Sequence, residues 1–164
     1  MLANYLVEFS DLDELWFVVS PQNPLKKKED LLDDDERLKM VQLAVGDDPR
    51  FCVSDIEMHL PTPSYTINTL DFLKESCGEE MEFAIITGSD IWARFDEWKD
   101  YERILNEYKI YVYPRKGYAV EKFADRVTIL EDAPFVEFSS TEIRDKRERN
   151  EDISAMVSPA VAKY

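Results

Sequence analysis

Short apolar segments rich in β-branched and aromatic residues alternate with helical patterns along most of the chain. The strongest strand patterns lie at residues 14–20, 51–53, 82–87 and 109–113, with a weaker one at 127–130. The first and third of these are apolar on both faces, as buried parallel strands are. Strands that alternate with helices predict an α/β fold in which helices cover both faces of a parallel sheet.

Helical periodicity separates these strands. Apolar residues recur at helical spacing in residues 2–7 and 33–45, and a later helix carries Ile67, Leu70 and Leu73 on one face. The chain has 164 residues, which is the size of one ordinary domain, and it contains no internal repeat, low-complexity tract or glycine/serine linker. We therefore expect a single domain.

Polar segments with charged, hydroxyl or glycine residues lie between the predicted elements, in positions where a ligand can be bound. In a parallel sheet, ligands bind beyond the carboxyl ends of the strands, where loops and helix N-termini meet. Four such segments are predicted to reach this edge, and they comprise residues 20–28, 63–66, 88–90 and 139–144. Their convergence predicts a binding site there.

Residues 139–144 carry the motif Ser-Ser-Thr-Glu-Ile-Arg at the expected start of a helix. Hydroxyl groups and free N–H groups at a helix N-terminus favour phosphate, and Arg144, one turn after Ser140, adds a forked guanidinium group. The alternative is a capping box, in which Ser139 caps the helix and Arg144 pairs with Glu148 on its surface. The motif alone leaves both interpretations open.

The charge and the cysteines narrow the classes of function. A formal charge of −15 argues against nucleic acid or an anionic membrane as a general partner. No apolar run approaches the roughly 20 residues of a membrane span, and no signal-peptide pattern is present, so we expect a cytoplasmic protein.

Cys52, Cys77 and the lone His59 make neither a disulfide framework nor a zinc spacing. We expect reduced cysteines, a structural or surface histidine, and no metal held by protein side chains.

Four motifs, taken together, resemble those of bacterial nicotinate-nucleotide adenylyltransferases, which belong to the nucleotidyltransferase superfamily. The motifs are Ser20-Pro21-Gln22-Asn23-Pro24, Pro63-Ser64-Tyr65-Thr66-Ile67-Asn68-Thr69-Leu70, Gly88-Ser89-Asp90 with Phe95 and Trp98 downstream, and Ser139-Ser140-Thr141-Glu142-Ile143-Arg144. The resemblance covers nearly the whole chain. It implies a Rossmann-like three-layer α/β sandwich with a mostly parallel sheet. It also implies transfer of AMP from ATP to nicotinate mononucleotide, which gives the dinucleotide and pyrophosphate in NAD biosynthesis.

The resemblance assigns one set of residues to ATP. These are Gly88, Asp90, Arg115, Ser139, Ser140, Thr141 and Arg144, of which Arg144 and Ser140 are expected to act in catalysis. Gly88 would let the backbone approach adenosine closely, and the Asp90 carboxylate could accept hydrogen bonds from ribose or adenine. The alternative for this motif is that Ser89 or Asp90 caps a helix.

A second set of residues is assigned to nicotinate mononucleotide by the same resemblance. These are Asn23, Lys26, Ser64, Tyr65, Thr66 and Trp98. A carboxylate at the helix start would meet backbone amides and the Thr66 hydroxyl, while the pyridine ring could stack on Trp98. The alternatives are core packing for Trp98, beside Phe95 and Trp92, and a solvated basic loop for the lysines at 26–28.

The family begins with a strand and a glycine-rich turn that ends in a His-x-Gly-His signature, and this signature does not occur in residues 1–164. We therefore expect the first strand of the fold to be missing from the sequence, so that residues 1–164 are an N-terminally truncated nucleotidyltransferase domain with little activity. The missing strand would be central, and its loss would leave open edges on two neighbouring strands.

The implied mechanism requires no protein nucleophile, because the phosphate of the mononucleotide can attack the α-phosphorus of ATP in line. Mg²⁺ on the ATP phosphates is the expected cofactor, with ATP as co-substrate. Two alternatives remain. The acceptor could be nicotinamide mononucleotide or phosphopantetheine, or the chain could be a non-catalytic nucleotide-binding module.

Overall fold

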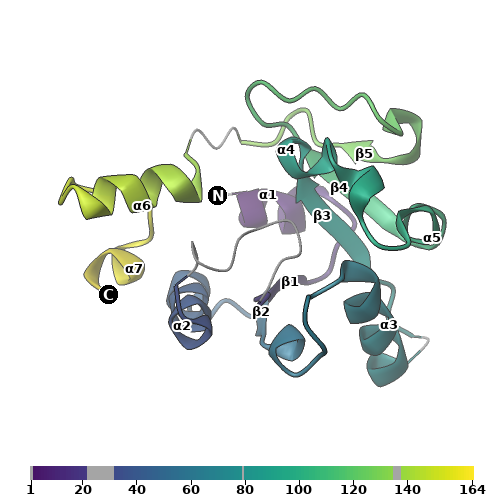
Figure 1. Cartoon of the computed structure of the whole chain (residues 1–164), viewed down its shortest axis with the longest axis horizontal. Helices are drawn as coiled ribbons and strands as arrows, with labels where there is room; N and C mark the ends of the chain where they lie inside the picture. Colours follow the sequence, from purple (N-terminus) through teal and green to yellow (C-terminus); the bar gives the residue numbers. More distant parts are fainter. Residues whose placement is uncertain (1, 22–31, 79, 135–137) are drawn as a thin grey trace.

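The computed structural model of this protein describes residues 2–21, 32–78, 80–134 and 138–164 (Figure 1). In chain order the elements are α1 (Leu2–Phe9), β1 (Leu15–Val18), α2 (Asp34–Val45), β2 (Phe51–Ser54), the 3-10 helix η2 (Ile56–Met58), α3 (Thr66–Cys77), β3 (Ala84–Gly88), α4 (Ser89–Trp92), the 3-10 helix η3 (Phe95–Glu97), α5 (Tyr101–Glu107), β4 (Lys109–Tyr113), the 3-10 helix η4 (Ala124–Arg126), β5 (Thr128–Ile129), α6 (Ser140–Glu148) and α7 (Pro159–Lys163). The predicted alternation of strands and helices is confirmed.

The strands form two parallel sheets within the described residues. β1 pairs with β2, with Leu15 opposite Phe51. β3, β4 and β5 form the other sheet, in which β4 is central and Ile85 lies opposite Ile110. The predicted parallel arrangement is confirmed, but β1 and β3 form no ladder with each other in the described part of the chain. One edge of each of these two strands therefore lacks a strand partner there.

Successive side chains of β3 and β4 point to opposite faces of their sheet, and each face has its own cluster. On one face, Ile110 and Val112 of β4 pack with helical residues that include Ile104 of α5. On the other face, Tyr111 of β4 packs with Leu6 of α1. Because a strand alternates its side chains with a period of two, helices cover both faces of this sheet. The predicted three-layer arrangement is confirmed.

The two sheets share the second of these clusters. Leu15 is a buried member of it, Phe17 packs against it, and so does Ile86 of β3. The Trp16 and Phe83 rings also meet edge to face, with centroids 6.2 Å apart. Side chains of β1 and β3 therefore belong to one core even though the backbones of these strands do not pair.

Helix boundaries follow local chemistry. The Asp33 carboxylate caps α2 by accepting a hydrogen bond from the Asp35 N–H at 3.0 Å, and three acidic residues lie in its first turn. The helix ends at Gly46, whose φ of 65° lies in a region that residues other than glycine rarely adopt. Figure 1 shows α6 and α7 on the same side as α2, and α7 contacts α2. The C-terminal helices therefore lie away from β5.

Candidate active site

β3 ends in a tightly packed turn. Gly88 has an ordinary extended conformation with φ of −81°, so its backbone torsion does not require glycine. An added Cβ would require the Asp90 carboxylate to move and would lie 3.1 Å from the Tyr113 hydroxyl oxygen. Gly88 therefore permits the ends of β3 and β4 to meet, and Asp90 and Tyr113 lie together at this point.

Tyr113 was not among the predicted site residues. Burial raises the pKa of its phenol; the Arg115 charge opposes the rise, and the Asp90 carboxylate adds to it. The phenol is thereby kept as a neutral hydroxyl group beside Asp90. Its position at the end of β4 could have been found from the rule that ligands gather at the carboxyl ends of strands.

Hydrogen bonds of Ser89 and Arg115 connect three segments that are distant in sequence. The Ser89 side chain is fully buried, and its Oγ accepts a hydrogen bond from the Arg115 N–H at 2.8 Å. The Arg115 guanidinium in turn donates to the Phe138 carbonyl oxygen at 3.3 Å. The structure thus brings the end of β3, the end of β4 and the start of α6 together, and it groups Gly88, Asp90 and Arg115 as the sequence predicts.

The start of α6 combines a cap with an unusual position for its arginine. Ser139 Oγ accepts a hydrogen bond from the Glu142 N–H at 3.1 Å, so the capping interpretation is confirmed for Ser139. The predicted pairing of Arg144 with Glu148 is wrong: the Arg144 guanidinium points back along the helix and donates to Thr141 Oγ1 at 3.3 Å. The Arg144 guanidinium therefore lies over the first turn of α6, in which Ser140 and Thr141 carry hydroxyl groups.

α3 begins differently from α2 and α6. Tyr65 occupies the N-cap position, and its side chain makes no capping hydrogen bond. The first turn of α3, which begins at Thr66, holds no acidic residue. The first amides of this helix and the positive end of its dipole are consequently available to an anion. Asn23 and Lys26, together with the rest of the lysine-rich loop, lie outside the described residues.

Trp98 directly precedes Lys99, whose side chain contacts the start of α3, and a series of rings links Trp98 to Trp92 of α4. Trp92 stacks on Phe95 with centroids 4.1 Å apart, and Phe95 meets Trp98 at 5.3 Å. Trp92 and Phe95 are core residues, whereas Trp98 is only half-buried at the margin of the core. Trp98 Nε1 and Ser64 Oγ are buried and have no hydrogen-bond partner in the described part of the protein. Trp98 therefore combines partial core packing with an unused donor.

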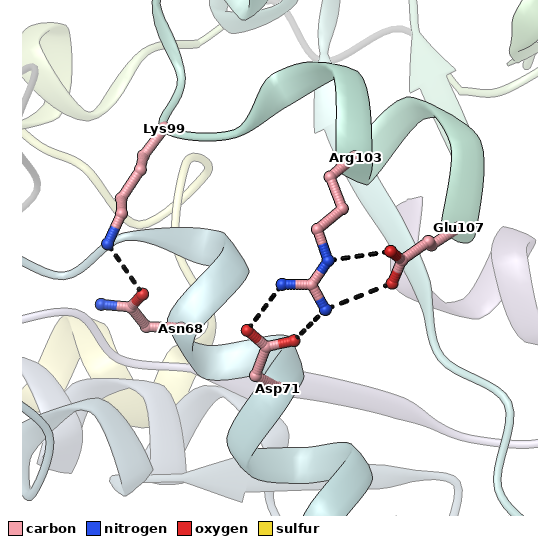
Figure 2. A network of polar contacts seen from close by, with 5 residues as sticks. All are labelled: Asn68, Asp71, Lys99, Arg103 and Glu107. Atoms are coloured by element: carbon pink, nitrogen blue, oxygen red, sulfur yellow. Dashed lines mark hydrogen bonds and ion pairs between the residues drawn. The ribbon is translucent and has the colours of Figure 1, made fainter.

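A polar network fixes α3 against the segment that follows Trp98 (Figure 2). Arg103 of α5 donates to both oxygens of Asp71 at 2.9 and 2.6 Å and also pairs with Glu107. Lys99 donates to the Asn68 side-chain oxygen at 3.3 Å. Lys99 was not predicted as a site residue, because nothing in the sequence indicates that it lies near the start of α3.

The remaining predictions concern the histidine, the two cysteines, metal ligands and membrane spans. His59 is exposed and contacts Asp55 at 3.2 Å, as expected for a surface histidine. Cys52 and Cys77 are free thiols, as expected. Residues 2–21, 32–78, 80–134 and 138–164 contain no group of three or more histidine, cysteine or acidic residues that could hold a metal ion. None of the helices described in these ranges is long and apolar enough to cross a membrane.

Comparison with known proteins identifies the family. The family model described as cytidylyltransferase-like matches residues 4–146. The chain belongs to this family. A curated relative from Bacteroides fragilis, named "Probable nicotinate-nucleotide adenylyltransferase", is 51% identical over 99% of this chain and 81% of its own length. A relative of the same name from Flavobacterium johnsoniae is 45% identical over 100% of this chain and 86% of its own length. The resemblance found in the motifs is confirmed.

Solved structures support the fold of this cytidylyltransferase-like chain. Nicotinic acid mononucleotide adenylyltransferase from Plasmodium falciparum, complexed with NaAD, matches with a TM-score of 0.70 and 17% identity over 99% of this chain and 86% of that chain. The same enzyme complexed with APC matches with a TM-score of 0.72 and 15% identity over 100% of this chain and 85% of that chain. The Rossmann-like α/β fold is therefore shared.

Proposed function

We propose that this protein transfers AMP from ATP to nicotinate mononucleotide, forming nicotinate adenine dinucleotide and pyrophosphate in NAD biosynthesis. The observation that carries this function is the identity of 40–51% with relatives named for that activity, over nearly the whole chain. The geometry supports it because the start of α6 is linked to the ends of β3 and β4 through Ser89, Arg115 and Phe138. The start of α3 has neither a side-chain cap nor an acidic residue in its first turn. We further propose that ATP is the co-substrate and that it is bound with a divalent metal ion, Mg²⁺, as the cofactor.

In the proposed reaction an oxygen of the mononucleotide phosphate attacks the α-phosphorus of ATP, the bond to the bridging oxygen breaks, and pyrophosphate leaves. Ser140 and Arg144 hold the ATP phosphates, with Ser139 and Thr141 beside them, and Arg144 stabilises the charge that develops. Gly88, Asp90 and Arg115 receive the adenosine. Mg²⁺ would arrive with ATP and would neutralise charge on its phosphates, held by phosphate oxygens and water rather than by protein side chains.

We place the mononucleotide at the start of α3, with its pyridine ring on Trp98 and its carboxylate at Ser64, Tyr65 and Thr66. Asn23 and Lys26 are assigned to the same substrate. Since a carboxylate accepts charge-assisted hydrogen bonds that a carboxamide does not, the acid is preferred over the amide. The proposed location of the reaction is the cytoplasm.

Replacing Trp98 by alanine is expected to weaken binding of nicotinate mononucleotide by roughly 1–3 kcal/mol, the scale of one aromatic stacking contact. The dissociation constant of the mononucleotide can be measured by isothermal titration calorimetry. Trp16→Ala is the matched control, because Trp16 is a half-buried tryptophan on β1 that lies against Phe83 rather than α3. Unchanged affinity in Trp98→Ala would assign Trp98 to core packing alone.

We further propose that residues 1–164 belong to a single nucleotidyltransferase domain whose central strand lies N-terminal to Met1. The support is the break in the sheet: β1 pairs only with β2, and β3 only with β4, in the described residues, while side chains of β1 and β3 share one core. A parallel strand between them would join both sheets. Reading the coding sequence upstream of Met1 for an in-frame strand and His-x-Gly-His turn tests this directly.

The function itself is tested by incubating the protein with MgATP and nicotinate mononucleotide and measuring the dinucleotide by chromatography. Both the 164-residue chain and a version extended upstream are assayed. Product formed by the extended protein supports the proposed function. Binding of ATP without product in both versions would instead favour a non-catalytic binding module, and preferred turnover of nicotinamide mononucleotide or phosphopantetheine would change the assigned acceptor.

A further inference from the structure

Lys99 lies over the first turn of α3. Its Nζ is 5.1 Å from the centroid of the Tyr65 ring, and it donates to the Asn68 side-chain oxygen at 3.3 Å. Tyr65 is the N-cap residue of α3, and Asn68 is in the first turn of this helix. Lys99 also directly follows Trp98 in sequence. One short segment therefore carries both the aromatic ring and a positive charge to the start of this helix.

The partners of Lys99 leave its charge uncompensated. Figure 2 shows two cations that reach α3 from the same side, Lys99 and Arg103. Arg103 is bound by two carboxylates, those of Asp71 and Glu107. The two partners of Lys99 are a neutral amide and an aromatic ring, and no carboxylate of the described residues forms an ion pair with it.

Donor groups without a partner among the described residues lie at the start of α3 and in the residue that precedes Lys99. The start of α3 has neither a side-chain cap nor an acidic residue in its first turn. The buried Nε1 of Trp98 and the buried Oγ of Ser64 have no hydrogen-bond partner in the ranges that the structure describes. A buried donor without a partner is costly, and a carboxylate that bound beside either of these groups would satisfy it.

We propose that Lys99 is a specificity residue that pairs with the pyridine carboxylate of the mononucleotide. The assignment rests on the proposed function, and it names the group that distinguishes the acid from the amide. On binding, the ammonium group turns from the Asn68 oxygen to the carboxylate, while the α3 amides bind the same anion. A neutral carboxamide at this position gains no ion pair, so Lys99 favours the acid selectively.

The test compares Lys99→Met with the unaltered protein in the upstream-extended version that forms product. The kcat/KM values for nicotinate mononucleotide and nicotinamide mononucleotide are measured at saturating MgATP. Lys99→Met is expected to lower the value for the acid by about tenfold, the scale of one charged hydrogen bond, and to change the value for the amide less than about twofold. Lys99→Arg, which retains the charge, is expected to preserve most of the preference for the acid.

Arg103→Met is the matched control, because it removes a cation of the same network whose carboxylate partners already compensate it. Its acid-to-amide ratio should equal that of the unaltered protein. An equal loss for both substrates in Lys99→Met would overturn the proposal, since it would indicate a structural role or a contact with the shared phosphate. An unchanged ratio would overturn it as well. Absence of product in the unaltered protein would instead contradict the proposed function, so the two failures are distinguishable.

Discussion

Turnover is expected to fall about 100-fold when Arg144 is replaced by alanine in the upstream-extended protein. The variant loses a charged group that donates hydrogen bonds to the phosphate being transferred. Removal of a single donor that stabilises a transition state typically lowers kcat about 100-fold to 1,000-fold. In the structure, the Arg144 guanidinium lies over the first turn of α6, bonded to Thr141 Oγ1. Steady-state kinetics with saturating MgATP and nicotinate mononucleotide measure the effect.

Two further variants separate this role from a structural one. Arg147→Ala removes an exposed arginine one turn further along α6, and we expect its turnover to stay within about twofold of the unaltered value, as surface changes usually do. Ser139→Ala removes the cap seen at Glu142 N–H and is expected to cost about 1 kcal/mol in the free energy of unfolding. Full activity in Arg144→Ala would contradict the assignment of the phosphate site to α6.

A second large effect is expected in stability. Phe95→Ala should lower the free energy of unfolding by about 3–5 kcal/mol, because deletion of a buried aromatic ring loses its transfer free energy and leaves a cavity. Phe95 has no exposed surface and contacts four other aromatic rings, those of Trp92, Trp98, Tyr101 and Phe123. Urea denaturation followed by tryptophan fluorescence measures the change.

The exposed Phe72 offers the control for this measurement. Phe72 lies on α3 and is 41% exposed, so Phe72→Ala deletes the same ring from a position that remains partly in water. Its cost is expected to be about 1 kcal/mol or less. If the two variants lose similar stability, the cluster around Phe95 is not the main core of the protein.

The fold was predictable from sequence to the extent that it depends on local pattern. Apolar segments with β-branched residues marked β1 to β4, and Gly46 marked the end of α2 because it supplies a conformation that other residues resist. The strand ends were less predictable: β4 matches residues 109–113 and β2 extends one residue past 51–53, but β1 spans Leu15–Val18 rather than residues 14–20. A strand end is set by where its neighbours stop pairing, and this is a property of the register, not of the strand's own residues.

Residues of the candidate site were predictable only where they belong to one of the four sequence motifs. The motifs indicated Gly88, Asp90 and Trp98, and the rule on strand ends placed them at one edge of a sheet. The roles of Ser89 and Lys99 were not predictable, because each depends on a contact with a residue far away in sequence: Ser89 with Arg115, and Lys99 with the first turn of α3. The direction of Arg144 toward Thr141 also depends on a choice among rotamers that the sequence does not specify.

In the described residues, one edge of β1 and one edge of β3 have no strand partner, and this affects how the chain associates with other copies of itself. Each edge presents a row of backbone N–H and C=O groups, and such a row accepts a strand from any chain with a suitable pattern. A polypeptide with these edges uncovered is therefore prone to strand exchange and aggregation at high concentration. A single strand that paired with both edges would complete the sheet and would also keep the protein soluble by blocking association through these edges.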